Sequence, residues 1–338
     1  MSYKLGILDQ SPIFPGTTAS HALKQTVLLA KKAEEWGYSR FWVSEHHNAE
    51  QLAGSSPEVL ISYLLAQTKS IQIGSGGVML QHYSPYKVAE NFHVLSNLAP
   101  GRVDLGIGKA PGGLPLSTKA LQYGTVNDGK DISERLSFLL DLIENSVDSR
   151  HPLAGIQATP IPQEKPEIFL LGASANSARL AAELGISFVF AKFINSDEAV
   201  LEEAANLYRE DFPNGRFIVS LAVIAAPTKT EAEQLIGNRK IVKVHLQSGR
   251  SVTVQSTEQA EFFGKQSGEP YEITEQEADI IAGTPDYITE VLNQLHKTYQ
   301  VDEFIIHTPF EQEAARYQSF QLLSPLKTAN LTIQPLNR

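Results

Sequence analysis

Short apolar runs alternate with longer, helix-like stretches along most of the chain. Eight runs have the length of buried strands, and they cover residues 5–8, 41–43, 71–73, 103–107, 168–171, 188–190, 217–224 and 303–306. Eight strands with helices between them predict an α/β fold, a closed parallel (β/α)8 TIM barrel. An open doubly wound sheet has the same local pattern, so the alternation favours the barrel without excluding the open sheet.

Two segments exceed what a bare barrel needs. Residues 110–131, after the fourth strand, are rich in Gly, Pro, Ser and Thr, and residues 237–281, after the seventh strand, look partly helical. We expect both to be insertions in a single domain that spans residues 1–338. Because each follows a strand, both are expected on the C-terminal face of the barrel, where they are candidates for a lid and a pocket wall.

Composition and charge narrow the classes of partner. The chain has 338 residues, 42% of them hydrophobic, a formal net charge of -10 and no cysteine. Without a run of Lys and Arg, neither nucleic acid nor a membrane is an expected partner. The absence of cysteine excludes disulfides and a thiol nucleophile and fits a reducing compartment. No apolar run approaches ~20 residues, which predicts a soluble, cytoplasmic protein.

The second strand is followed by Ser44-Glu45-His46-His47-Asn48, at the end of a strand where a barrel places catalysis. Adjacent residues of an extended segment point to opposite sides, so His46 and His47 are not expected to share a ligand, and we predict no metal site. An imidazole that faces the barrel axis can accept and return a proton at neutral pH. The alternative is a loop with hydrogen-bonded histidines.

Glycines follow the third strand, where Gly74, Gly76 and Gly77 allow backbone to approach a flat ligand closely. The alternative is a β-bulge at a corner of the barrel. After the fourth strand, Pro111 replaces the third glycine of a dinucleotide fingerprint and no helix follows directly. Lys109 remains as a cation that either meets a phosphate or is solvated.

The fifth strand leads through Gly172 and Ser174 into an Ala-rich helix. A helix N-terminus binds phosphate through its free N–H groups, and Ser174 and Ser177 would add hydroxyl donors one turn apart. Alternatively, Ser174 is simply the N-cap of the helix. Lys109, which follows the neighbouring strand, favours the phosphate interpretation.

Together these segments resemble the bacterial luciferase-like family of flavin-dependent monooxygenases over nearly the whole chain. The resemblance rests on four motifs in the family's order: FWVSEHHN, IGSGGVMLQHYSPYKVAE, GRVDLGIGKAPGG and LGASANSARLAAELG. It implies a TIM barrel that binds FMN, with the phosphate held by Lys109, Ser174 and Ser177. The family more often has arginine at the position of Lys109, and Lys109 keeps the charge but not the bidentate fork.

The resemblance also implies a non-prolyl cis peptide at Gly76–Gly77, beneath the isoalloxazine ring. It assigns the proton chemistry of the flavin reaction to His46 rather than to His47. Luciferase has a reactive cysteine where this chain has Gly108, a departure that argues against light emission. A homodimer is expected only by analogy.

The resulting hypothesis is a two-component monooxygenase, in which a separate NAD(P)H:flavin reductase supplies reduced FMN and O2 oxidises a small organic substrate. One rival is an F420-dependent hydride-transfer enzyme on the same fold, whose larger anionic cofactor would favour more basic residues than Lys109 and Arg179. Other rivals are a flavin-binding protein without turnover and a barrel enzyme without flavin. The sequence does not identify the substrate.

Overall fold

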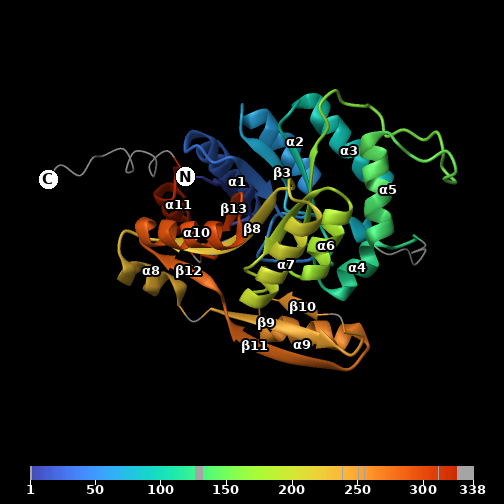
Figure 1. Cartoon of the computed structure of the whole chain (residues 1–338). Helices are drawn as coiled ribbons and strands as arrows, with labels where there is room; N and C mark the ends of the chain where they lie inside the picture. The colour runs from blue at the N-terminus through green and yellow to red at the C-terminus, as the bar shows by residue number, and fades with distance from the viewer. Residues whose placement is uncertain are drawn as a thin grey trace.

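The eight predicted strands form one closed barrel. The computed structural model describes residues 2–125, 132–237, 239–249, 251–254, 256–310 and 312–325. In their order around the barrel, the strands are β1 (Lys4–Asp9), β2 (Arg40–Val43), β3 (Gln72–Ser75), β5 (Val103–Gly108), β6 (Glu167–Gly172), β7 (Ser187–Ala191), β8 (Phe217–Ala225) and β13 (Glu303–His307). Neighbouring strands are parallel, and the β13–β1 and β7–β8 pairings close the sheet. The predicted (β/α)8 barrel is confirmed and the open sheet is excluded (Figure 1).

Helices surround the barrel (Figure 1). They are α1 (Ala19–Glu35), α2 (Pro57–Gln67), α3 (Pro85–Leu98), α5 (Ile132–Glu144), α6 (Ala175–Glu183), α7 (Glu198–Asp211), α10 (Pro285–Tyr299) and α11 (Glu313–Leu322). The largest apolar cluster lies between them and the outer side of the strands, where Phe41, Phe92 and Phe188 are completely buried. Burial of this continuous layer drives the helices onto the sheet.

Two short strands extend the barrel beyond its eight predicted ones. After Gly76 and Gly77 the chain returns to the sheet as β4 (Val78–Met79), which pairs with β5. The strand β12 (Ile280–Gly283) lies parallel to the C-terminal half of β8. The third strand therefore has two parts, separated by the glycines, rather than the single run 71–73.

The predicted insertions have regular structure of their own. Residues 110–125 contain α4 (Pro115–Leu121), whereas the predicted end of this insertion, 126–131, lies outside the described residues. After α8 (Lys229–Ile236), the segment 237–281 contains β9 (Lys240–Leu246), β10 (Ser251–Val254), α9 (Thr257–Ser267) and β11 (Tyr271–Glu277) before it enters β12. The prediction of partly helical structure holds for α9, but it missed an antiparallel sheet in the order β10–β9–β11.

This small sheet has a separate apolar cluster. Val242, Val244 and Leu246 alternate along β9 and pack against Phe263 of α9. The two insertions also meet, because α4 packs on α9 and the Leu116 amide donates to Gln266 Oε1 at 3.1 Å. Figure 1 shows the sheet projecting from the barrel in the lower part of the view.

The inside of the barrel is filled in layers. Its middle layer is an apolar cluster of Leu8, Trp42, Phe169, Val189, Ile218 and Ile305. Below it, at the N-terminal ends of the strands, lies the guanidinium of Arg40, 4.9 Å from the centre of the Phe169 ring. Side chains alternate between the two sides of a strand, so Arg40 and Trp42 both face the barrel axis.

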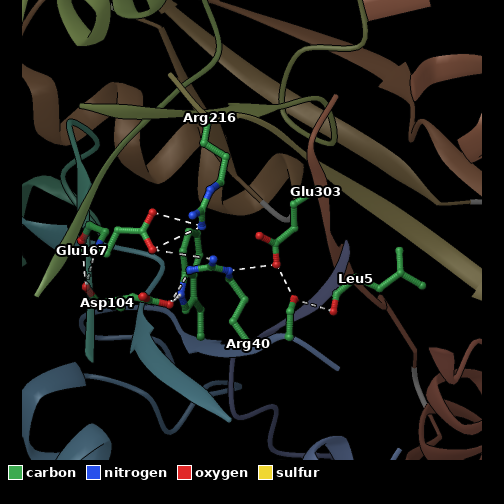
Figure 2. A network of polar contacts seen from close by, with 10 residues as sticks. Leu5, Arg40, Asp104, Glu167, Arg216 and Glu303 are labelled. Atoms are coloured by element: carbon green, nitrogen blue, oxygen red, sulfur yellow. Dashed lines mark hydrogen bonds and ion pairs between the residues drawn. The ribbon is translucent and has the colours of Figure 1, made fainter. Parts of the chain in front are cut away.

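Arg40 is the centre of a charged network that closes the floor of the barrel (Figure 2). Its Nη1 is 2.6 Å from Asp104 Oδ2 and its Nε is 2.9 Å from Glu303 Oε1, and all three side chains are at most 2% exposed. Glu167 lies 3.9 Å away and also pairs with Arg216 at 3.0 Å. The neighbouring carboxylates raise the pKa of Arg40 against the opposing effect of burial, so the guanidinium stays charged.

We expect Arg40→Met to lower the free energy of unfolding by about 3–5 kcal/mol, because Asp104 and Glu303 would remain as buried carboxylates without their cation. Arg150→Met is the matched control, since Arg150 pairs with Asp148 at 2.8 Å on the surface, where the arginine is 89% exposed. The control should change stability by less than about 0.5 kcal/mol. Urea unfolding at one protein concentration gives the free energy of unfolding of both variants. Equally small changes in that free energy would contradict this role of Arg40.

Candidate active site

The two histidines after β2 point in different directions. The alternation that turns Trp42 toward the barrel axis turns Ser44 and His46 the same way, and Ser44 Oγ lies 3.0 Å from His46 Nδ1. His47 points outward, with its Nε2 atom 2.7 Å from Glu45 Oε1. His46 is therefore the member of the pair at the C-terminal mouth of the barrel. Its assignment to proton chemistry stays a prediction.

Glu45 contacts several groups on the side of the β2 extension that faces away from the barrel axis. Its fully buried carboxylate accepts hydrogen bonds from the Tyr83 hydroxyl at 2.7 Å and from the Met79 amide at 3.0 Å, in addition to its contact with His47. The amide of His47 donates to Gly112 O at 2.7 Å. Glu45 and His47 thus link β2 and β4 to the 110–125 segment.

A second contact anchors the same segment. The Nε2 atom of His82 lies 2.8 Å from the carbonyl oxygen of Pro111, and its Nδ1 atom lies 3.3 Å from Gln122 Nε2. The 110–125 segment is therefore attached to the barrel near both of its ends. This placement agrees with the expectation of an insertion on the C-terminal face.

Sequence reasoning missed a third histidine at the mouth. His307 is the last residue of β13 and lies on the same side of the strand as Ile305 of the interior cluster. Its ring packs against Phe193, with 5.4 Å between ring centres. The available signal was its position at the C-terminal end of the eighth strand, where barrel active sites gather.

Both mouth histidines are held neutral. Burial, followed by the neighbouring His47, lowers the pKa of His46 to about 4. Burial, followed by Arg316, His46 and Arg239, lowers the pKa of His307 to about 3. At neutral pH each imidazole therefore has one N–H donor and one acceptor nitrogen, the state that a proton acceptor requires.

The glycines after β3 are required by close packing. The peptide bond Gly76–Gly77 is cis, as the resemblance implies. A Cβ atom on Gly76 would lie 2.7 Å from Leu8 Cδ1, and one on Gly77 would lie 2.7 Å from the backbone oxygen of Gly106. A side chain at Gly77 would therefore collide with the backbone of β5, whereas one at Gly76 would have to displace the end of the Leu8 side chain.

The expected phosphate-binding residues converge at the ends of two neighbouring strands. Ser174 caps α6: its Oγ atom accepts from the Ser177 amide at 3.3 Å and lies 3.1 Å from Ser177 Oγ. Gly172 is packed so tightly that a Cβ atom would lie 2.4 Å from Ser177 Cβ. Lys109 follows β5, which pairs with β6, and this places its backbone beside the Gly172 turn. The N-cap interpretation of Ser174 is confirmed, and a cap leaves the first N–H groups of α6 available to an anion.

The described residues also bear on two other classes of site, metal centres and membrane spans. No group of three His, Asp or Glu side chains there is arranged to hold a metal ion. Over the same part of the chain, none of the helices has the length and apolar character needed to cross a membrane.

Comparison with known proteins identifies the class. The family model described as "Luciferase-like monooxygenase" matches residues 3–300. The N-acetyl-S-alkylcysteine monooxygenase of Bacillus subtilis (strain 168) is 50% identical over 324 residues, which are 95% of this chain and 97% of the relative. This chain therefore belongs to the luciferase-like monooxygenase family, and the resemblance seen in its motifs is confirmed.

Solved structures agree with this assignment at the level of the fold. The structure of apo-MsnO8 is 30% identical with a TM-score of 0.78, over 98% of this chain and 99% of that one. The oxygenating constituent of 3,6-diketocamphane monooxygenase from Pseudomonas putida, solved with FMN, has a TM-score of 0.69 at 21% identity, over 96% and 97% of the two chains. An F420-dependent secondary alcohol dehydrogenase has a TM-score of 0.64 at 16% identity, over 96% and 99%. The fold alone therefore does not select between FMN and F420.

We expect His46 and His307 to remain neutral from about pH 8 to about pH 5, the interval in which unperturbed histidines titrate. Proton NMR measures the pKa of each imidazole from its ring resonances, which are assigned with the variants His46→Gln and His307→Gln. Because the pKa of each is lowered in the folded state, stability is expected to fall as the pH drops below about 6.5, where the unfolded chain takes up protons first. Titration of either resonance near pH 6.5 in the folded protein would refute this assignment.

Proposed function

We propose that this protein is the oxygenating component of a two-component monooxygenase, which receives reduced FMN from a separate NAD(P)H:flavin reductase and oxygenates a small organic substrate with O2. The observation that carries the proposal is the neutral His46 imidazole at the barrel mouth, within a family of monooxygenases. Two strand ends at the same mouth supply Ser174, Ser177 and Lys109.

The residues present fit a flavin mononucleotide. The two serine hydroxyls and the start of α6 offer donors to a phosphate dianion, and the Lys109 ammonium adds a charge. The backbone of Gly76 and Gly77 offers a surface without side chains to a flat ring. Reduced FMN, when bound there, would supply the electrons that activate O2.

The chain's own residues would control protons and water. His46, neutral and oriented by Ser44, would accept and return one proton beside the flavin. The 110–125 segment, anchored through Gly112 and Pro111, would keep water from the reacting atoms. Both tasks are confined to the C-terminal face.

The substrate class follows from the relative that is 50% identical. That protein is named for N-acetyl-S-alkylcysteine. We extend this class to the present chain: the substrate would be an N-acylated cysteine whose sulfur bears an alkyl group. Such a molecule combines an apolar thioether with one carboxylate.

The first experiment is a titration of the apoprotein with FMN and with F420, followed by product analysis after mixing with reduced FMN, O2 and N-acetyl-S-methylcysteine. We expect a preference for FMN and an oxygenated product that forms only with the protein, because reduced FMN consumes O2 on its own. Lys109→Gln should weaken FMN binding about tenfold through the loss of one charge-assisted contact. Arg179→Gln is the matched control, because Arg179 is an exposed cation on the same helix as Ser177.

His46→Gln should bind FMN normally and lose about 100-fold or more of its substrate oxygenation, in the usual range for removal of a positioned acid–base group. Product formation, measured separately from hydrogen peroxide release, detects the loss. A preference for F420 would replace the proposal by the hydride-transfer enzyme. FMN binding without oxygenation, unaffected in His46→Gln, would leave a flavin-binding protein.

We also propose that the protein is a homodimer that pairs through the outer face of α2 and α3. The helix α2 is apolar on both sides: Ile61 and Leu64 are buried against the barrel, whereas Val59 and Tyr63 are 70% and 56% exposed. On the adjacent α3, Leu98 is 68% exposed. A helix that is apolar all round is normally buried on all sides, and a second copy of the chain would cover this face.

Val59→Glu combined with Tyr63→Glu is expected to convert the dimer to a monomer, because two charges would be buried without partners at the centre of the interface. Light scattering after size exclusion measures the mass. Leu153→Glu, at another exposed leucine (52%), should leave the dimer intact. A wild-type monomer at all concentrations would disprove the proposed pairing.

A further inference from the structure

The side chain of Met79 lies on the inner side of the barrel mouth. Met79 of β4 is paired with Gly108 of β5, and paired residues of neighbouring strands point to the same side of the sheet. On β5, Asp104 faces the barrel axis, where it binds Arg40, and alternation places Gly108 on the same side. A Cβ atom on Gly108 would lie 3.0 Å from both Sδ and Cε of Met79. The Met79 sulfur therefore lies at the inner rim, beside Gly108.

The same side chain supports the 110–125 segment. A Cβ atom on Gly112 would lie 3.0 Å from Met79 Cγ, and the backbone oxygen of Gly112 accepts from the His47 amide at 2.7 Å. The backbone of Met79 is also held in place, because its amide donates to Glu45 Oε2 at 3.0 Å. Met79 is thus packed between two glycines and is 9% exposed. An oxygen atom added to its sulfur would either press on these glycines or project into the mouth.

Met79 carries the functional group that the proposed reaction oxidises. It is a thioether, like the proposed substrate, and the chain contains no cysteine and one further methionine, Met1. Among the residues that the structure describes, Met79 therefore has the sole sulfur-containing side chain. Reduced flavin and O2 form hydrogen peroxide when no substrate takes up the oxygen. A thioether at the mouth meets this oxidant where it is formed.

We propose that Met79 is a modification site, oxidised to methionine sulfoxide when the protein consumes reduced FMN and O2 without substrate. The inference rests on the proposed function and adds an internal thioether that competes with the substrate. The O–O bond of hydrogen peroxide breaks, one oxygen atom bonds to the Met79 sulfur, which gives up two electrons, and the other oxygen leaves as water. Because the sulfoxide is polar, it weakens the packing against Gly112 and the attachment of the 110–125 segment.

The competing interpretation is that Met79 only fills the space beside two glycines. A methionine with that role and 9% exposure would be oxidised more slowly than an exposed methionine, and only by peroxide that arrives from the solution. Catalase, which destroys peroxide in solution, would then protect it. Oxidation by peroxide formed at the mouth predicts the opposite order of rates and little protection.

The test uses the variant Leu153→Met, which adds a reporter methionine at a position that is 52% exposed. The protein receives repeated additions of chemically reduced FMN in air, with catalase and without substrate. Mass spectrometry then compares the peptides that contain positions 79 and 153. We expect the gain of one oxygen atom, about 16 Da, to be about fivefold or more as frequent at Met79 as at position 153. Saturating N-acetyl-S-methylcysteine should protect Met79.

A second readout connects the modification with the 110–125 segment. After the same treatment, wild type should release more hydrogen peroxide per molecule of oxygenated product than untreated wild type, because a loosened segment admits water to the mouth. Met79→Leu replaces the thioether by an apolar side chain of similar volume. Its peroxide release should stay at its own untreated value.

Equal oxidation of the two positions, or full protection of Met79 by catalase, would overturn the proposal. An unmodified Met79 in protein that oxygenates N-acetyl-S-methylcysteine would also overturn it and would leave the proposed function intact. Conversely, oxidation of Met79 in the presence of catalase, without any oxygenated N-acetyl-S-methylcysteine, would support the modification site and reject the proposed reaction on the substrate.

Discussion

The side chains of a closed parallel barrel face alternately inward and outward, and this constraint assigns a role to each residue of the mouth. Along β2 and its extension, Arg40, Trp42, Ser44 and His46 all face the axis. The same strand thus contributes to the charged floor, to the apolar middle layer and to the rim that carries His46. A shift of one residue in register would exchange His46 with His47 and place a buried arginine among the surrounding helices.

The charged network on the floor of the barrel lies apart from the candidate active site. Arg40, Asp104 and Glu303 are confined to the floor, beneath an apolar layer that includes Trp42 and Phe169. Above that layer, His46 and His307 are imidazoles whose pKa values are lowered by burial. A neutral imidazole can accept a proton without first losing one, which suits a site that handles an electron-rich cofactor and oxygen.

Local sequence patterns were sufficient to predict the barrel and the motifs at the ends of its strands. In each of these features a few adjacent residues determine the local structure: the apolar runs, the pair Gly76 and Gly77, and the turn from Gly172 to Ser174. The link from Glu45 to Tyr83 and Met79 was not predictable, because it joins groups more than 30 residues apart that only the closed barrel brings together. His307 was missed for a related reason, since a single histidine after an apolar strand does not indicate what faces it.

The antiparallel sheet of the second insertion was missed because β11 is mostly polar and exposed and β10 has only four residues, and because the helix-like run around Phe263 dominated the pattern. That sheet nevertheless has its own apolar cluster, distinct from the two clusters of the barrel. Its residues can therefore be exchanged without repacking the barrel. In engineering terms, the β9–β11 unit is a module whose sequence can be varied separately from the floor and the middle layer of the barrel.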